Sequence, residues 1–488
     1  MDSLTMQTFT HRFAIALLSF SVLPLAHAQQ TTGATGPDAQ SVKGAQLKGK
    51  APINSRSLSM RLPKPVEAQL QNGLRVVLIE DHKLPTLFIQ CVLLERGDAA
   101  DARDQQSAAR ATAAQLREGT ASRTGAELSE QLDALGGSLN GASGTLDSSL
   151  TVTGLSEHLD PLLSIFADVL LHPSFPSDEL ERYKTRYISQ LQAQRAQPGF
   201  MAREQLYKTL YGDHPAGTLA PTDEQVKKIS AADLKAFHAR FYRPNGALLL
   251  VAGDVTMKQL LPKLEKAFGE WQPSAEQPPA LPVVADMGKP QVFVVDRPGS
   301  VQTSLLMGTL GIKGNHADRA ALGVMSQVLG ASAASRLFMN LREDKGYTYG
   351  AYSSVSLSRY PGLISANAEV RTEVTEAAMH EFIYELKRIA SEPVGDVELA
   401  NAKRAIVGRF ALSLEEPRNF IGNVFEQIVY KFPADYWDHY AERVDAITAS
   451  EVQRVAKKYL DLSRLQIVAV GDASKIRRVM DQFKAPAN

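Results

Sequence analysis

The sequence holds the same pattern twice, and this internal repeat limits the possible folds more than any other feature. The segment from Ile229 predicts a helix, then an apolar strand at 247–252, and then a Gly253-Asp254 turn. The segment from Ile447 predicts the same series and ends at Gly471-Asp472. The two copies align without a gap, because 447 − 229 and 471 − 253 both give 218. We therefore expect two homologous domains, and not a solenoid, whose repeats are only about 20–50 residues long.

Both copies share a helix-start signal, which strengthens the alignment. Ser230 precedes Asp233 by three residues, and Thr448 precedes Glu451 by three, so each copy resembles a capping box. Such a pair satisfies backbone N–H groups in the first turn, which have no partner within the helix. The two segments are thus expected to begin their helices in the same way.

The repeat also extends toward the N-terminus. The apolar run Arg75–Glu80 corresponds to Gln291–Asp296, and each run is followed by a turn and a second apolar strand. Pro198 corresponds to Pro417 in the same way. These matches extend the repeat over most of each expected domain.

The repeat sets the expected domain boundaries and the fold class. We expect an N-terminal domain at 63–278, a linker at 279–287 and a C-terminal domain at 288–488. Helical patterns alternate with short β-rich runs, which predicts an α+β fold in which each domain has an antiparallel-rich sheet with helices packed on one face. The main helical patterns lie at 126–135, 178–194 and 375–389.

The N-terminus predicts export. His11-Arg12 precede an apolar run at 13–25 and then Ala26-His27-Ala28, which together have the form of a signal peptide, 1–28. The apolar run is shorter than the roughly 20 residues that span a bilayer, so stable membrane insertion is not expected. The polar, glycine-containing segment 29–62 predicts a flexible tether.

Charge and cysteine content narrow the possible partners and the location. Lys and Arg total 53, as do Asp and Glu, and this balance argues against nucleic acid as a partner, since nucleic acid requires a basic surface. Cys91 is the single cysteine, so we expect neither an intrachain disulfide nor a cysteine-based metal site, and we interpret Cys91 as a buried hydrophobe. Export with one cysteine favours a bacterial periplasm.

Several motifs resemble those of the pitrilysin/insulinase-type zinc peptidases, and the resemblance covers nearly the whole chain after the tether. In the first domain these motifs are Leu70-Gln-Asn-Gly-Leu-Arg-Val-Val, Leu135-Gly-Gly-Ser138, Leu170-Leu-His-Pro173 and Tyr242-Arg-Pro-Asn-Gly246. In the second domain they are Ser335-Arg-Leu-Phe338 and Leu341-Arg-Glu-Asp-Lys-Gly-Tyr-Thr-Tyr349. The resemblance implies that two such domains make half of a four-domain clam-shell around unfolded peptides.

The positions that hold zinc in this family have changed in this chain. Active members carry H-x-x-E-H on one helix, so that two imidazoles one turn apart reach one Zn²⁺, and a distal Glu completes the ligands. Arg110 and Ala114 stand at the two His positions, Ala113 at the position of the general base, and Gln190 at the distal Glu. All three ligands and the base are absent, so the resemblance implies no metal and no cofactor in this chain.

The resemblance also implies two functional residues in the second domain, Arg342 and Tyr349. They match an Arg and a Tyr, seven residues apart, that line the cleft facing the zinc in this family. Peptide hydrolysis builds negative charge on the carbonyl oxygen, and a phenol can donate a hydrogen bond there at neutral pH. We expect Tyr349 to stabilise this oxyanion and Arg342 to orient the substrate backbone, while Tyr347 and Tyr352 are interpreted as packing residues. Alternatively, Arg342 is only solvated and Tyr349 only packs on the sheet.

The expected function follows from the absence of the zinc ligands and the presence of Arg342 and Tyr349. The chain resembles the zinc-less subunit of an exported heterodimeric zinc endopeptidase, inactive alone, whose partner subunit carries H-x-x-E-H and the zinc and whose substrates are unstructured peptides. The alternative is a catalytically inert scaffold that is structural or holds peptides. A protease that works without a partner is the least favoured interpretation, because the metal ligands are absent.

Overall fold

The computed structural model describes residues 62–101, 107–285 and 288–484. The predicted signal peptide, 1–28, and almost all of the predicted tether, 29–62, lie outside the described residues. Among the helices that are described, none combines the length and the apolar character that crossing a membrane requires.

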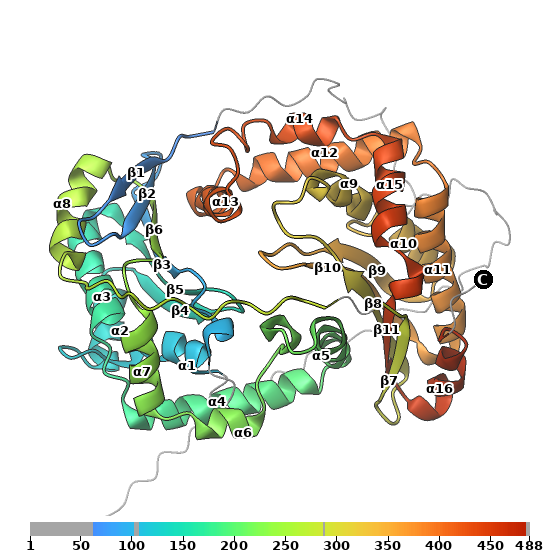
Figure 1. Ribbon diagram of the computed structural model, residues 1–488, viewed down its shortest axis with the longest axis horizontal. Coiled ribbons are helices and arrows are strands. Elements are labelled where there is room, and N and C mark those ends of the chain that lie inside the picture. Colours follow the sequence, from blue (N-terminus) through green and yellow to red (C-terminus); the bar gives the residue numbers. More distant parts are fainter. Residues whose placement is uncertain (1–61, 102–106, 286–287, 485–488) are drawn as a thin grey trace, which may run out of the picture. The chain divides into compact units, whose positions relative to one another are not determined.

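The first half of the chain forms a six-stranded sheet with the strand order β1-β2-β6-β3-β5-β4 (Figure 1). β2 and β6 run parallel, and the other neighbours are antiparallel. The strands are β1 (Val66–Gln69), β2 (Arg75–Glu80), β3 (Thr86–Leu93), β4 (Ser138–Ser143), β5 (Ser148–Leu155) and β6 (Ala247–Gly253).

The second half forms a five-stranded sheet with the order β7-β11-β8-β10-β9. Its one parallel pair, β7 and β11, corresponds to β2 and β6, so the two sheets share their topology apart from the extra strand β1. The strands are β7 (Gln291–Asp296), β8 (Gln302–Leu310), β9 (Thr348–Val355), β10 (Leu363–Arg371) and β11 (Gln466–Gly471). The repeat in the sequence is therefore a repeat of the fold, and the predicted α+β class is confirmed.

The helices occupy equivalent places in the two halves. Those of the first half are α1 (Ala108–Gln115), α2 (Gly125–Ala134), α3 (Leu159–Leu171), α4 (Ser177–Arg195), α5 (Pro198–Tyr211), α6 (Asp223–Lys228), α7 (Ala231–Phe241) and α8 (Met257–Phe268). Those of the second half are α9 (Arg319–Leu329), α10 (Arg336–Phe338), α11 (Thr375–Ser391), α12 (Asp396–Ser413), α13 (Pro417–Tyr430), α14 (Tyr440–Asp445), α15 (Ala449–Tyr459) and α16 (Ala473–Asp481). Both predicted capping boxes form, at the starts of α7 and α15.

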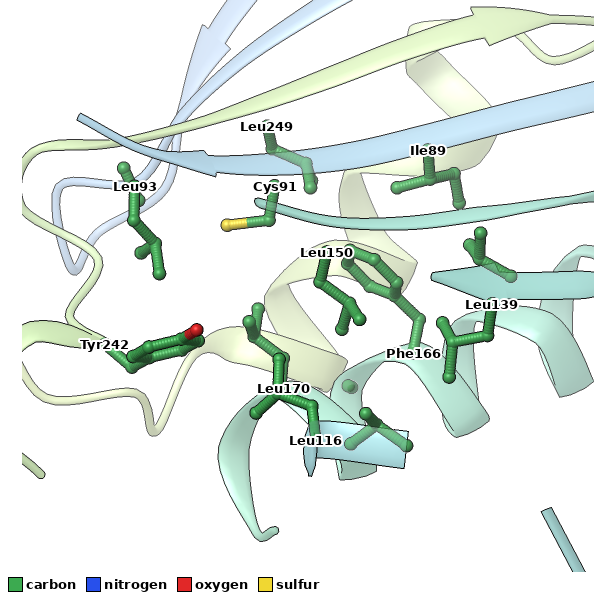
Figure 2. Packing of buried hydrophobic residues seen from close by; sticks show 14 of the residues in the cluster. Ile89, Cys91, Leu93, Leu116, Leu139, Leu150, Phe166, Leu170, Tyr242 and Leu249 are labelled. Carbon is green, nitrogen blue, oxygen red and sulfur yellow. The ribbon is translucent and has the colours of Figure 1, made fainter. Parts of the chain in front are cut away.

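One face of each sheet packs on the helices of its own half. In the first half, Cys91 on β3 lies among Leu150, Leu249 and Tyr242 (Figure 2). Its thiol is fully buried, and burial raises its pKa to about 12, so Cys91 is an inert core residue as predicted. In the second half, α9, α11 and α15 pack on the corresponding face.

Each half also places one helix on the sheet of the other half. α5 packs on β8 and β11 of the second sheet, and α13 packs on β6 of the first. The buried residues of α5 that share a hydrophobic cluster with Leu306 and Val468 are Ala202, Leu206, Leu210 and Tyr211. The buried residues of α13 that contact β2, β3 and β6 are Phe420, Ile421 and Val424. We call α5 and α13 the exchanged helices. They begin at the corresponding residues Pro198 and Pro417, and the missing N–H of proline loses no hydrogen bond there because the first N–H groups of a helix have no partner within it.

Two hairpins add polar contacts between the halves. Arg359, in the loop between β9 and β10, forms an ion pair with Asp147, between β4 and β5. The Tyr211 hydroxyl donates a hydrogen bond of 3.1 Å to the carbonyl oxygen of Pro361. These contacts fix the second hairpin beside the C-terminal end of α5.

Truncating an exchanged helix at its buried face should destabilise the whole protein. Leu206→Ala on α5 removes a fully buried side chain and leaves a cavity against the second sheet. We expect a loss of about 3 kcal/mol in the free energy of unfolding, measured by urea denaturation. Lys208→Ala, at an exposed position of the same helix, is the control and should change little. Equal stabilities of the two variants would show that α5 is not held as described.

The partly buried ring of His238 should make the free energy of unfolding depend on pH. Burial lowers the pKa of His238 to about 4, while its Nε2 lies 2.8 Å from the carbonyl oxygen of Leu170. Between pH 6.5 and about 4 the unfolded chain binds a proton that the folded chain does not, so stability falls as the pH falls, by about 3 kcal/mol in all.

Urea denaturation at several pH values checks this contribution. Because carboxyl groups also titrate in this range, the informative quantity is the difference in pH slope between the wild type and His238→Gln. The variant should have the flatter slope, and identical slopes would contradict a neutral, partly buried imidazole.

Candidate functional site

Helix α1, which matches the family's zinc helix, is mostly buried within the first half. It packs against α4, α7, β4 and β5. Ala113, at the position of the general base, is fully buried. A Cβ atom at Gly141 on β4 would lie only 1.9 Å from the carbonyl oxygen of Ala113, so glycine is required for this close approach. The small residues of α1 therefore serve tight packing.

The guanidinium of Arg110 lies on the partly exposed side of α1. Arg110, at the first His position, forms an ion pair of 2.6 Å with Asp98, and the Tyr187 hydroxyl on α4 contacts the same group. Burial by itself lowers the pKa of Arg110, but the hydrogen bond and the charge of Asp98 outweigh burial and raise it. The cation of this pair is thus permanent at any physiological pH.

The residues at the ligand positions do not fit zinc. Arg110 is a cation, Ala114 has no donor atom, and Gln190 is a neutral amide on the exposed side of α4. In the described ranges, no three His, Cys, Asp or Glu side chains are grouped closely enough to hold a metal ion. The positions that hold zinc in this family therefore offer no zinc ligand set in this chain.

A polar groove lies on the second sheet, on the face that α5 partly covers. Its volume is about 550 Å³. Strands β8, β9 and β10 form its floor, and α5 forms one wall. The lining residues are Gly199, Ala202, Arg203, Tyr207, Gln302, Ser304, Leu306, Thr348, Tyr349, Gly350, Tyr352, Ser354, Ser356, Leu363, Ser365, Asn367 and Glu369.

The groove is polar because the strands alternate. Tyr352 and Ser354 on β9 lie opposite Asn367 and Ser365 on β10, and all four side chains are on the groove face. The residues between them, such as Ala366, point into the helix-covered core. Sequence reasoning missed this face, although the alternation of polar and apolar residues at 364–370 is a detectable signal.

Tyr349 lies at the end of the groove, at an irregularity in the sheet. The pairing of β9 with β10 shifts register between Ala368 and Val370, as in a β-bulge, and the Thr348 hydroxyl donates to the carbonyl oxygen of Glu369. Bulges re-aim side chains, and the Tyr349 side chain is 88% exposed. The predicted phenol is therefore presented to the groove, not packed on the sheet.

Arg342 lies in the π-helix Met339–Asp344, just before β9. The N–H of Lys345 donates to the carbonyl oxygen of Asn340, five residues back, and such turns are frequent at functional sites. The guanidinium stacks 4.6 Å above the Phe338 ring, lies 3.5 Å from Glu343 and is half exposed. Arg342 does not line the groove, so the structure does not bring it into contact with Tyr349.

The interpretation of Tyr352 as a packing residue is only half right. Its ring contacts Phe338, with centroids 5.8 Å apart, but the side chain is half exposed and lines the groove. Tyr347, in contrast, packs against the core of the second half as predicted. Successive side chains of β9 point to opposite faces of the sheet, and Tyr352 points to the groove face and not to the core.

A Ser, an Asp and a His also meet just beyond the C-terminal ends of β5, β6 and β2 in the first sheet. Asp254 accepts hydrogen bonds from Ser156, at 3.0 Å, and contacts His82, at 2.6 Å. The carboxylate lies between the other two groups, so His82 cannot take the proton of the Ser156 hydroxyl directly, as nucleophilic catalysis requires. This cluster stabilises the Gly253-Asp254 turn and is not a hydrolytic site.

Comparisons with known proteins agree with this fold and site. The sequence model of the insulinase family (peptidase family M16) matches residues 77–222, and the model of the peptidase M16 inactive domain matches residues 228–406. The uncharacterized zinc protease YmxG of Bacillus subtilis is 25% identical over 353 residues, 71% of this chain and 83% of that protein. The non-peptidase homolog YmxG of Helicobacter pylori is 24% identical over 405 residues, 82% of this chain and 92% of that protein.

A solved structure is similar over nearly its whole length. A protein from Pseudomonas fluorescens described as a peptidase M16 inactive domain has a TM-score of 0.76 and 25% sequence identity, covering 84% of this chain and 98% of that chain. The fold and site thus define a zinc-less protein of peptidase architecture. The chain belongs to peptidase family M16, the pitrilysin/insulinase-type family that its motifs predicted, and residues 228–406 match the model of that family's inactive domain.

The ion pair at the altered zinc helix should stabilise the fold. Arg110→Ala leaves the carboxylate of Asp98 buried without its cation, and we expect a loss of about 2 kcal/mol in the free energy of unfolding, measured by urea denaturation. The control is Arg117→Ala, an exposed arginine just beyond the same helix. Arg110→Leu combined with Asp98→Asn should lose less than Arg110→Leu alone. Wild-type stability of Arg110→Ala would contradict this role.

Proposed function

We propose that this chain is the non-catalytic subunit of an exported heterodimeric zinc endopeptidase. It holds an unstructured peptide in the polar groove and presents Tyr349 to the scissile carbonyl group, while a homologous partner subunit with H-x-x-E-H supplies the zinc. One observation carries the proposal: the same chain combines an open groove containing Tyr349 with a closed, ligand-less zinc helix.

The groove has the properties of a peptide site. Its floor is a sheet face of serine, asparagine and tyrosine side chains, which give adaptable hydrogen bonds and rigid contact area with little side-chain selectivity. β9 is also the edge strand of the second sheet. The N–H of Ser353 already donates to the carbonyl oxygen of Gly330, but the other outer N–H and C=O groups can pair with an added strand. An extended, unfolded peptide meets both conditions.

Tyr349 is suited to stabilise an oxyanion. Its side chain is almost fully exposed at the end of the groove, so its hydroxyl can donate to an oxygen that gains charge in the transition state. The guanidinium of Arg342, in the π-helix just before β9, can donate to backbone carbonyl groups of a peptide that extends beyond the groove.

The partner and the location complete the proposal. A chain without zinc ligands needs another subunit to activate water, and the match to an inactive domain of family M16 supports a catalytic M16 subunit as that partner. Residues 1–28 have the form of a signal peptide, which supports a periplasmic location.

A second candidate function is a scaffold that holds peptides without helping to cleave them. The stacking of Arg342 on Phe338 favours it, because this contact gives the arginine a structural role outside the groove. The two functions differ in whether a change at Tyr349 slows the chemical step.

Co-expression with an M16 homologue that carries H-x-x-E-H tests the proposal. The assay follows cleavage of an unstructured fluorogenic peptide by each chain alone and by the pair. Only the pair should cleave. Tyr349→Phe should lower kcat about 100-fold with little change in KM, because it removes a donor used in the transition state. Arg342→Ala should act mainly on KM, by about tenfold.

The control is Tyr384→Phe, which removes the hydroxyl of an exposed tyrosine on α11 that does not line the groove. It should leave kcat and KM unchanged. If the partner cleaves equally well alone, the heterodimer is wrong. If the pair is required but Tyr349→Phe keeps the wild-type kcat, the scaffold is the correct function.

A further inference from the structure

The groove contains one carboxylate, and it lies beside Tyr349. Glu369 on β10 is exposed and lines the groove. The register shift of β9 against β10 falls at this residue, so Glu369 lies across from the segment Tyr349-Gly350. The Thr348 hydroxyl bonds the backbone carbonyl oxygens of both Glu369 and Gly350, which fixes the two strands here.

The Glu369 side chain forms no ion pair within the part of the chain that is described. Arg371, two residues further along the same face, is already engaged by Glu373 at 3.0 Å and by the carbonyl oxygen of Gly346 at 2.8 Å. Arg203 on α5 is the other charged residue that lines the groove, and it forms no ion pair with Glu369. The carboxylate is thus available to a ligand.

We propose that Glu369 selects peptides with a lysine or arginine side chain next to the bond presented to Tyr349. The inference rests on the proposed function of the groove. All other groove residues except Arg203 are uncharged, so a substrate cation has a single anionic position to occupy. Because Glu369 is exposed, this contact has the modest strength of a surface ion pair and weakens as salt is added.

Direct peptide binding to this chain tests the inference without a partner subunit. The probes are two fluorescein-labelled peptides of serine, asparagine and glycine, about nine residues long, that differ only in a central lysine or norleucine. Fluorescence anisotropy should give about fivefold tighter binding of the lysine peptide, and the difference should shrink as salt is added. Glu369→Gln should abolish the difference.

Two further variants make the outcomes distinct. Glu376→Gln removes an exposed carboxylate that does not line the groove, and it should keep the lysine preference. Ser354→Trp fills the floor of the groove and should prevent binding of both peptides.

Equal binding of the two peptides by the wild type, or an unchanged preference in Glu369→Gln, would overturn the role of Glu369 and leave the proposed peptide groove intact. Absence of binding to either peptide, or binding that Ser354→Trp does not affect, would overturn the groove itself and the inference with it. Loss of the preference in Glu369→Gln alone supports the inference.

Discussion

The reciprocal burial of α5 and α13 is the constraint on which the rest of the structure depends. Each helix begins at an equivalent proline and covers part of the sheet in the other half, with Leu206 on one side and Val424 on the other as buried contacts. Burying these apolar faces provides free energy that neither half can gain alone. The exchange also leaves the remaining part of the second sheet's face uncovered, and this part is the floor of the groove.

The two halves have diverged around this shared frame. In the first half, α1 lies so close to β4 that only glycine fits at Gly141, and Arg110 with Asp98 provides charge balance at the former ligand position. In the second half, the equivalent edge strand, β9, carries Tyr349 out of the sheet at a bulge. We propose that this chain keeps the part of the family architecture that holds and orients peptides.

Much of this fold could be predicted from the sequence, because the relevant signals are local. The capping pairs at Ser230 and Thr448 and the apolar strands after them indicate two equivalent domains, and fixed spacing identifies the altered zinc positions. The partners of Arg110 and of α5 could not be predicted, since they depend on contacts between distant segments. The groove face was not predicted, and Tyr352 was interpreted as a packing residue because aromatic rings are typical of buried strands. Its position on β9 instead places the side chain on the groove face. The exact domain boundaries and the roles of Arg342 and Tyr349 stay predictions.

Photo-crosslinking from the groove tests the central claim most directly. The chain is made with p-benzoylphenylalanine in place of Tyr349 and irradiated with an unstructured peptide, and the products are identified by mass spectrometry. The same residue in place of Tyr384, which is exposed outside the groove, is the control. The account predicts that the peptide attaches efficiently at position 349 and not at position 384. Equal attachment at both positions, or none at 349, would contradict a peptide site at Tyr349.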